Sequence, residues 1–280
     1  MTAALRLLSR RKAAVLGAAV LALVAALAVG GPALTRIDPL KMNLLDALSA
    51  PSPAHPFGTD QYGRDVLSRV ITGARLSLVT GLGAVAIALT GGLVLGLVSG
   101  AGGGWTDLLI MRVVDVMMAF PSVLLALVVV AVLGHGSTNV MVAVGVSLIP
   151  TFVRLIRGNV LVVRENAYIE AARALGCPPR RVTLQHILPN IVAPVIVLAT
   201  IAIAWSIIIG ASLSFLGLGP RPPTPEWGVD LSNGRNYLLR GWWISAGPGV
   251  AIMTTVVAVN LVGDTLRDVL DPRLRSLTNL

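Results

Sequence analysis

The chain has 280 residues, of which 55% are hydrophobic and only 12% are charged, and its mean hydropathy is +0.83. Soluble domains carry about 25% charged residues, so this composition excludes an ordinary soluble protein. The formal net charge of +9 is interpreted as a membrane-topology signal rather than as a nucleic-acid-binding surface. The single cysteine, Cys177, excludes an internal disulfide and a cysteine-based metal cluster.

Six apolar stretches without a charged residue predict an all-α integral membrane protein with six transmembrane helices. A spanning helix needs about 20 apolar residues, and two of the stretches are short and must borrow residues from their flanks. Outer-membrane strands would instead be about 10 residues of alternating polarity. The stretches are Ala13–Val29, Leu76–Val98, Val116–Leu133, Val140–Phe152, Ile191–Leu216 and Pro248–Val262.

The basic cluster Ser9–Lys12 before the first stretch imitates a twin-arginine signal peptide. The apolar run of 17 residues after it is longer than the usual signal core of about 7 to 15, so we expect no cleavage and interpret the cluster as a topology anchor. Lys and Arg are commoner in the segments that six crossings place on the side of the N-terminus. The positive-inside rule therefore predicts cytoplasmic N- and C-termini.

Within the predicted spans, small residues and prolines indicate close packing and bends. Pro121 and Pro150 lie inside predicted helices and can bend them. Arg112 and Asp115 are interpreted as an interfacial pair at the inner edge of the third helix. A face of small residues recurs every four positions and predicts a seam of close helix packing. Its members are Gly92, Gly96, Gly100 and Gly104.

The polar segment between the fourth and fifth spans, residues 164–190, predicts two short helices joined by a glycine elbow. Ala167–Leu175 are good helix formers, and Gly176 supplies the left-handed residue that ends such a helix. Pro178 suits the first turn of a second helix. We expect that helix to run to Leu188 and to stop at Pro189, whose ring clashes with the preceding turn.

This segment resembles the EAA motif of bacterial ABC importer permeases, which reads Glu-Ala-Ala, three residues, Gly, nine residues, Ile, one residue, Leu-Pro. One position departs, because His186 stands where the motif has isoleucine. By residue pattern alone, Glu170 and Arg173 can pair weakly on one helix face, and a solvated amphipathic loop is the alternative. The resemblance implies ATPase contact by Glu170, Ala171, Ala172, Arg173, Gly176, Leu188, Pro189 and Asn190.

Two further stretches resemble the C-type permeases of the dipeptide, oligopeptide and nickel branch. They are residues 55–69 (HPFGTDQYGRDVLSR) and residues 214–228 (SFLGLGPRPPTPEWG). Without the resemblance they predict turns outside the membrane, with Arg64 and Asp65 solvated and with Trp227, Trp242 and Trp243 in an interfacial aromatic belt. The resemblance implies an outer surface on which a solute-binding protein docks.

The resemblance implies a type I ABC importer permease (MetI-like) fold in a bacterial inner membrane. The expected division is an N-terminal part, residues 1–75, and a five-helix permease core, residues 76–280, that contains the coupling loop 164–190. The implied partners are a second, B-type permease subunit, two ATPase subunits, an extracytoplasmic solute-binding protein and a peptide substrate. No Walker lysine is present, so we expect no catalytic or cofactor site here and expect ATP and Mg²⁺ to be used by the ATPase subunits.

The three histidines lie in separate regions, so no metal site is expected. Three alternatives remain open. Nickel complexes or glutathione could replace peptides as substrate. An ATP-independent secondary transporter would be expected to carry buried mid-span charges or an inverted repeat. A membrane enzyme would be expected to gather His, Asp or Glu at one face.

Overall fold

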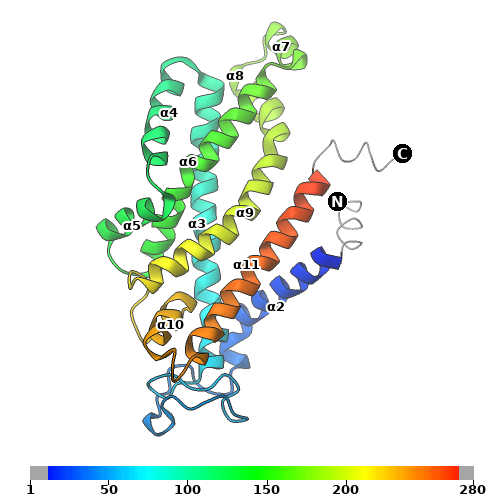
Figure 1. Cartoon of the computed structure of the whole chain (residues 1–280). Coiled ribbons are helices and arrows are strands. Elements are labelled where there is room, and N and C mark those ends of the chain that lie inside the picture. The colour runs from blue at the N-terminus through cyan, green and yellow to red at the C-terminus, as the bar shows by residue number, and fades with distance from the viewer. Residues whose placement is uncertain (1–11, 271–280) are drawn as a thin grey trace.

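The computed structural model describes residues 12–270, which form a bundle of long helices with short helices and loops at both ends (Figure 1). Predictions for the N-terminal basic cluster before Lys12 lie outside the described residues. The long helices are α2 (Lys12–Leu34), α3 (Val66–Gly102), α4 (Gly104–Met118), α5 (Ser122–Leu133), α6 (Ser137–Arg164), α9 (Leu188–Phe215) and α11 (Trp243–Leu270). The short ones are η1 (Leu44–Asp46), α7 (Ala167–Ala174), α8 (Pro179–Arg181), η2 (Val182–Ile187), α10 (Trp227–Gly234) and η3 (Arg235–Tyr237).

By length and composition, five of the described helical segments can each cross a membrane unbroken, and the bent pair α4–α5 brings the number to six if it counts as one span. The predicted span over Val116–Leu133 is divided between two helices, because α4 and α5 meet at an angle of 95°. Pro121 stands at the break with ψ of 135°, and a proline disfavours helical geometry in the residue before it. The predicted bend at Pro121 is therefore confirmed, whereas α6 continues through Pro150.

The centre of the bundle is a seam between α3 and α6. A Cβ added to Gly96 would lie 2.8 Å from the Cβ of Ile156, and one added to Gly100 would lie 2.8 Å from that of Val160. Gly92 faces Phe152 in the same way. The predicted small-residue seam is confirmed for these three glycines. It is wrong for Gly104, which has φ of +54° and begins the next helix, with open space around it.

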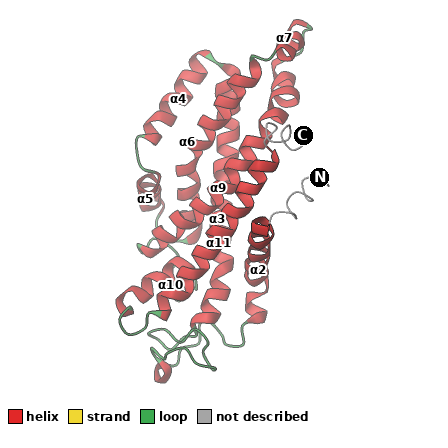
Figure 2. Cartoon of the chain, turned by 45° about the vertical axis from the view of Figure 1, so that its right-hand side comes forward, coloured by secondary structure: helices red, strands yellow, loops and turns green. Residues whose placement is uncertain are grey.

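The seam also fixes the direction of the chain. Each glycine of α3 contacts a residue that lies the same distance further along the sequence in α6, so α3 and α6 run parallel. The chain must therefore return between them, and α4–α5 make this return along one side of the bundle (Figures 1 and 2). This connectivity supports counting α4–α5 as one broken crossing.

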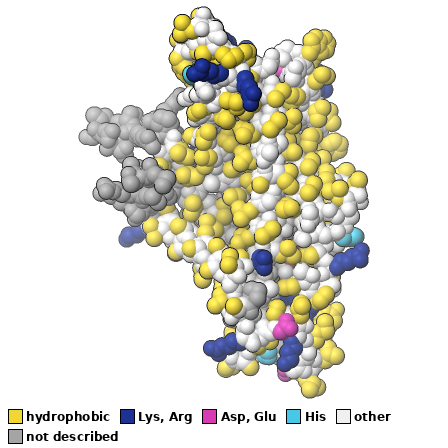
Figure 3. All heavy atoms as spheres, turned by 180° about the vertical axis from the view of Figure 1, so that it is seen from behind, with side chains coloured by type: hydrophobic (Ala, Val, Ile, Leu, Met, Phe, Trp, Pro, Cys, Tyr) yellow, Lys and Arg dark blue, Asp and Glu magenta, His cyan; other side chains and the backbone are white. Residues whose placement is uncertain are grey.

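The remaining long helices complete the bundle around this pair. Helix α9 packs against α3, α6 and α11, while α2 lies against α3 and α11. Figure 3 shows hydrophobic side chains covering much of one face, with Lys and Arg near its upper end and scattered over its lower half. A hydrophobic outer surface of this extent is typical of a protein that contacts hydrocarbon.

We expect Gly96→Leu to destabilise the isolated chain in detergent, because the new side chain meets Ile156 and a backbone oxygen, with a penalty of about 1 to 3 kcal/mol. Gly158→Leu is the matched control, since a Cβ there meets nothing within 4 Å and the gain in helix propensity is similar. The midpoint of thermal loss of monodisperse protein measures both. Equal midpoints for the two variants would contradict the seam.

Candidate functional site: the coupling segment and the loop cap

The predicted glycine elbow between the fourth and fifth spans is confirmed. Gly176 has φ of +80°, and its N–H donates to the carbonyl of Arg173 at 2.9 Å. The N–H of Cys177 donates to the carbonyl of Ala172 at 3.1 Å. These two bonds form a Schellman turn at the end of α7, and glycine adopts its left-handed residue without strain.

Buried apolar side chains fasten this segment to the bundle. Ile169 of α7 is 0% exposed, and Val182 and Ile187 of η2 are also buried. All three belong to the same apolar cluster as Ile156 and Val160 of α6. The segment is therefore a packed extension of the bundle.

The opposite side of the segment is open to solvent. Leu175 is 86% exposed and Tyr168 is 46% exposed, although both are apolar enough to favour burial. Glu170, Ala171 and Arg173 are exposed as well. The described residues show no ion pair between Glu170 and Arg173, so their predicted pairing is not formed. Helix α7 lies at the extreme end of the molecule (Figure 1).

The second helix of the segment does not stop at Pro189, contrary to the prediction. The chain passes from α8 through a π-helical turn, η2, into α9, and Pro189 lies in the first turn of α9. The N–H of Leu188 donates to the carbonyl of Thr183, five residues earlier. This wider turn relieves the clash between the proline ring and the preceding turn, so the helix continues. Asn190 donates its side-chain N–H to the carbonyl of His186 at 2.6 Å.

A groove of about 590 Å³ lies between this segment and the end of α3. Its lining is largely apolar, with Val94 and Leu97 on α3 and with Arg173 and Arg180 from the segment. Cys177 is a partly buried free thiol in its wall.

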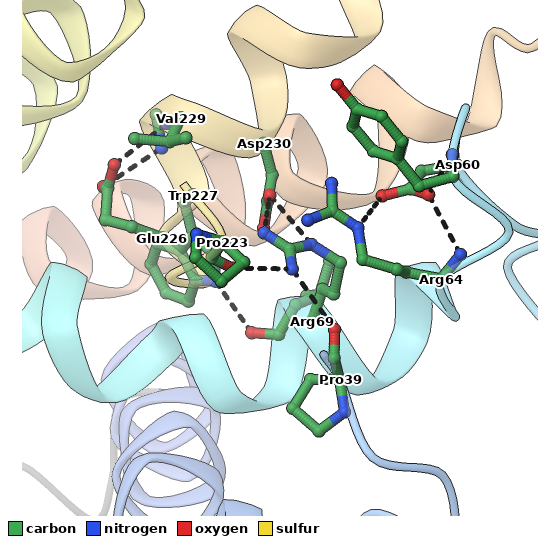
Figure 4. Close-up of polar contacts among 12 residues, drawn as sticks. Pro39, Asp60, Arg64, Arg69, Pro223, Glu226, Trp227, Val229 and Asp230 are labelled. Atoms are coloured by element: carbon green, nitrogen blue, oxygen red, sulfur yellow. Dashed lines mark hydrogen bonds and ion pairs between the residues drawn. The ribbon is translucent and has the colours of Figure 1, made fainter. Parts of the chain in front are cut away.

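At the other end of the molecule, residues 35–65 and 216–242 form what we call the loop cap, and an ion pair ties it to α3 (Figure 4). Arg69 donates from Nε and Nη2 to Oδ1 of Asp230, at 3.0 and 2.5 Å. Its Nη1 donates to the carbonyls of Pro39 and Pro223. Both side chains are buried, and burial raises the pKa of Asp230 to about 6 against the opposing effect of Arg69. One guanidinium therefore joins three separate parts of the chain.

Glu226 begins α10 and links it to α3. Its carboxylate accepts from the N–H groups of Gly228 and Val229 and from the hydroxyl of Ser77. The next residue, Trp227, is 2% exposed and donates from Nε1 to the carbonyl of Val70 at 2.9 Å. The prediction that Trp227 belongs to an interfacial belt is therefore wrong, because its ring lies in the packing between α10 and α3.

The first predicted turn region is equally well ordered by hydrogen bonds. Arg64 donates from Nε to Asp60 at 2.6 Å, and both are buried. Asp65 accepts from the N–H of Ser68, which caps α3, and its other carboxylate oxygen contacts His55 at 2.9 Å. Arg64 and Asp65 are not solvated, contrary to the prediction, and they shape the cap instead.

Comparison with known proteins agrees with this arrangement. Residues 92–276, most of the chain, match the family described as the binding-protein-dependent transport system inner membrane component. The chain belongs to this family. It is therefore a multi-pass permease of the inner membrane, with an all-helical type I importer fold.

Three relatives match between 78% and 98% of the permease. A dipeptide transport system permease protein of Alkalihalophilus pseudofirmus is 42% identical over 98% of this chain and 90% of its own length. A glutathione transport system permease protein of Pectobacterium atrosepticum is 47% identical over 81% of this chain and 75% of its own length. A di/tripeptide transport system permease protein of Pseudomonas aeruginosa is 47% identical over 78% of this chain and 72% of its own length.

One solved structure supports the fold alone. The methionine ABC transporter in an inward-facing conformation superimposes with a TM-score of 0.58 at 18% identity, over 72% of the permease and 96% of that chain. The helical fold is thus shared over that part of the chain, and the division into residues 1–75 and a five-helix core at residues 76–280 stays a prediction.

Helix α4 of the permease is held to α6 by ion pairs that the sequence did not indicate. Arg157 donates to both carboxylate oxygens of Asp107, at 2.5 and 2.7 Å. Arg154 donates to Asp115 at 2.8 Å. The predicted pair of Arg112 with Asp115 is therefore wrong. The apolar residues 160–163 indicated that the helix continues past Arg154 and Arg157, whereas the predicted span ended at Phe152.

We expect Asp230→Leu to destabilise the permease by about 3 to 5 kcal/mol, because it leaves the Arg69 guanidinium buried without its carboxylate. The double variant Arg69→Met/Asp230→Leu removes the stranded charge and serves as the control. Thermal unfolding in detergent should place the double variant well above the single one. A double variant as unstable as the single one would show that the loss does not come from the stranded charge of Arg69.

Proposed function

We propose that the permease forms half of the channel of an ATP-driven importer for short peptides, and that residues 164–190 couple it to an ATPase subunit. The observation that carries this proposal is the rigid segment at the end of the bundle. It is fastened by Ile169, Val182 and Ile187 and presents exposed Leu175 and Tyr168 outward. Exposed apolar side chains on a fixed element are typical of a protein-docking surface.

The coupling would be mechanical. Because α7 is packed against α6 and the π turn continues directly into α9, a push on the segment moves two spans together. An ATPase pair that closes on ATP would draw two such segments toward each other and switch the channel between two states. ATP and Mg²⁺ belong to the ATPase subunits in this proposal.

The remaining partners follow from the two ends of the molecule. The end that bears α7 is cytoplasmic, as are both termini. The loop cap faces outward and receives the solute-binding protein. A second, distinct permease subunit completes the channel and covers apolar surface that this chain leaves open, including Leu124, Val128 and Val132 on α5.

Relatives favour peptides as the substrate class, because their names include dipeptide, di/tripeptide and glutathione transport. Glutathione is itself a small peptide and is the second candidate. The deciding experiment reconstitutes the chain with its partner permease, its ATPases and its binding protein in liposomes. We expect dipeptide uptake that requires ATP. Uptake by the permeases without ATPase would replace the proposal with a secondary transporter.

Glu170→Lys should weaken association with the ATPase, because it reverses the charge of an exposed side chain on α7. Glu165→Lys is the matched control, since Glu165 is also exposed but precedes α7 and the motif. Co-purification of the ATPase with a tagged permease measures the effect. Equal recovery with the two variants would count against docking at α7.

Gly176→Val should uncouple transport from ATP hydrolysis, because a left-handed β-branched residue is strained by more than about 1 kcal/mol. Gly176→Asn is the control, since asparagine tolerates this conformation and a Cβ meets nothing within 4 Å there. Peptide uptake per ATP hydrolysed should fall for valine and stay near wild type for asparagine. An unchanged ratio for valine would refute the role of the elbow.

A further inference from the structure

Helix α4 has little apolar packing to hold it in the bundle. It lies along one side, in the half of the bundle that bears α7 (Figures 1 and 2). Of its 15 described residues only Val114 is buried, whereas α6 has buried residues along most of its length. Burial of apolar surface therefore contributes little to the position of α4.

The link between α3 and α4 does not fix α4 either. Helix α3 ends at Gly102, and the next two residues, Gly103 and Gly104, have φ of +64° and +54°. A Cβ added to either of these two would meet nothing within 4 Å. Glycine is the residue with the most backbone freedom, and no neighbouring side chain restricts it here. A change in the angle between α3 and α4 therefore meets little steric resistance at this link.

A contact among three helices holds the start of α4 instead. Arg157 of α6 donates from Nε and Nη2 to the two carboxylate oxygens of Asp107 on α4, at 2.5 and 2.7 Å. Ser99 of α3 donates its hydroxyl to the same carboxylate. We call Ser99, Asp107 and Arg157 the clasp. Two-pronged bonds between a guanidinium and a carboxylate are strong and directional, so the clasp fixes the first turn of α4 against α3 and α6.

The clasp is the firmer of the two ion pairs that join α4 to α6 in the described part of the chain. The side chains of Asp107 and Arg157 are 21% and 27% exposed, whereas those of Asp115 and Arg154 are each 51% exposed. Asp115 accepts a single bond from Arg154, and Asp107 accepts three bonds in all. Exposed single-bonded pairs contribute little in water. Asp107 is therefore the main polar attachment of α4.

Helix α6 connects the clasp to the coupling segment. Arg157 lies about two turns before Arg164, at which α6 ends. Arg164 itself donates from Nη1 to the carbonyl of Gly100 on α3, at 3.1 Å. Ile169 of α7 is buried in the same apolar cluster as Ile156, the residue before Arg157. The coupling segment and the clasp are thus attached to the same stretch of α6.

We propose that Asp107 and Arg157 are positioning residues for transport, through which α4 follows α6 when an ATPase subunit displaces the coupling segment. The inference rests on the proposed function, because it needs a coupling segment that moves. Without the clasp, the glycine link lets α6 move while α4 stays behind. Since α4 leads into α5, the movement then fails to reach the α5 surface that we assign to the second permease subunit.

The first test removes the charge of Asp107 in the importer reconstituted with its partner permease, ATPases and binding protein. Asp107→Asn keeps the size of the side chain, and Asp115→Asn is the matched control on the same helix. We expect dipeptide uptake per ATP hydrolysed to fall at least about fivefold for Asp107→Asn and less than about twofold for the control. Co-purification of the ATPase should stay near wild type, because the clasp lies outside the docking surface. Equal ratios for the two variants would overturn the proposal.

The second test asks whether α4 and α6 move as one body. In a Cys177→Ser background, Asp107→Cys/Arg157→Cys removes the clasp and places one thiol on each helix. A short bifunctional maleimide then joins the two thiols, and Asp107→Cys alone, treated in the same way, is the control for modification. We expect uptake per ATP hydrolysed to be low before cross-linking and to recover toward that of Cys177→Ser afterwards. A ratio that stays low in the cross-linked importer would show that α4 must move against α6, contrary to the proposal.

The two proposals fail in different ways. If the wild type imports dipeptides with ATP but Asp107→Asn couples as well as Asp115→Asn, the function stands and this inference is wrong. If the wild type imports no dipeptide while the binding protein still stimulates its ATP hydrolysis, the peptide substrate is wrong. The clasp is then judged by that stimulation, which Asp107→Asn should lower and Asp115→Asn should leave unchanged.

Discussion

The close contact between α3 and α6 is the constraint on which the rest of the permease depends. Three glycines let the two backbones approach, and in a membrane such van der Waals contact replaces the hydrophobic effect as the source of helix association. Helix α3 reaches the loop cap at one end through Arg69 and Ser77. At the other end its Gly100 carbonyl accepts from Arg164, just before the coupling segment. The seam thus joins the loop cap to the coupling segment, which lie at opposite ends of the molecule.

The sequence predicted the elements that depend on local chemistry. Continuous apolar runs indicated the helices, and the elbow followed from Gly176, because few other residues adopt a left-handed conformation. The sequence failed where distant residues decide the outcome. Asp230 lies far along the chain from Arg69, and Asp115 pairs with Arg154 rather than with its near neighbour Arg112. The predicted stop at Pro189 was wrong because a π turn accommodates the proline, and no local sequence pattern indicated that turn.

Charge is handled differently in the two polar regions of the bundle. At the loop cap, Asp230 is buried and bonded to Arg69 of α3, and Asp60 is buried and bonded to Arg64, so these charges fix the geometry of the cap. Along α4 and α6 the pair of Asp115 and Arg154 is half exposed, and α4 has only one buried side chain, Val114. Helix α4 is held mainly by ion pairs, and it has glycines before it and a proline after it. A movement of α4 would therefore break fewer packing contacts than a movement of the loop cap.

The repeat of four residues along the seam has a further consequence, because it sets the distance between α3 and α6 without setting their alignment. Sliding α3 by one repeat, about 6 Å, would again place glycines against large side chains. Contacts that do not follow the four-residue repeat must therefore select one of these alignments of α3 and α6. Gly145 of α6 faces Ile87 of α3, so the small and large partners are exchanged there. Together with the contacts at the two helix ends, this exchange makes one alignment unique among several that glycine alone would allow.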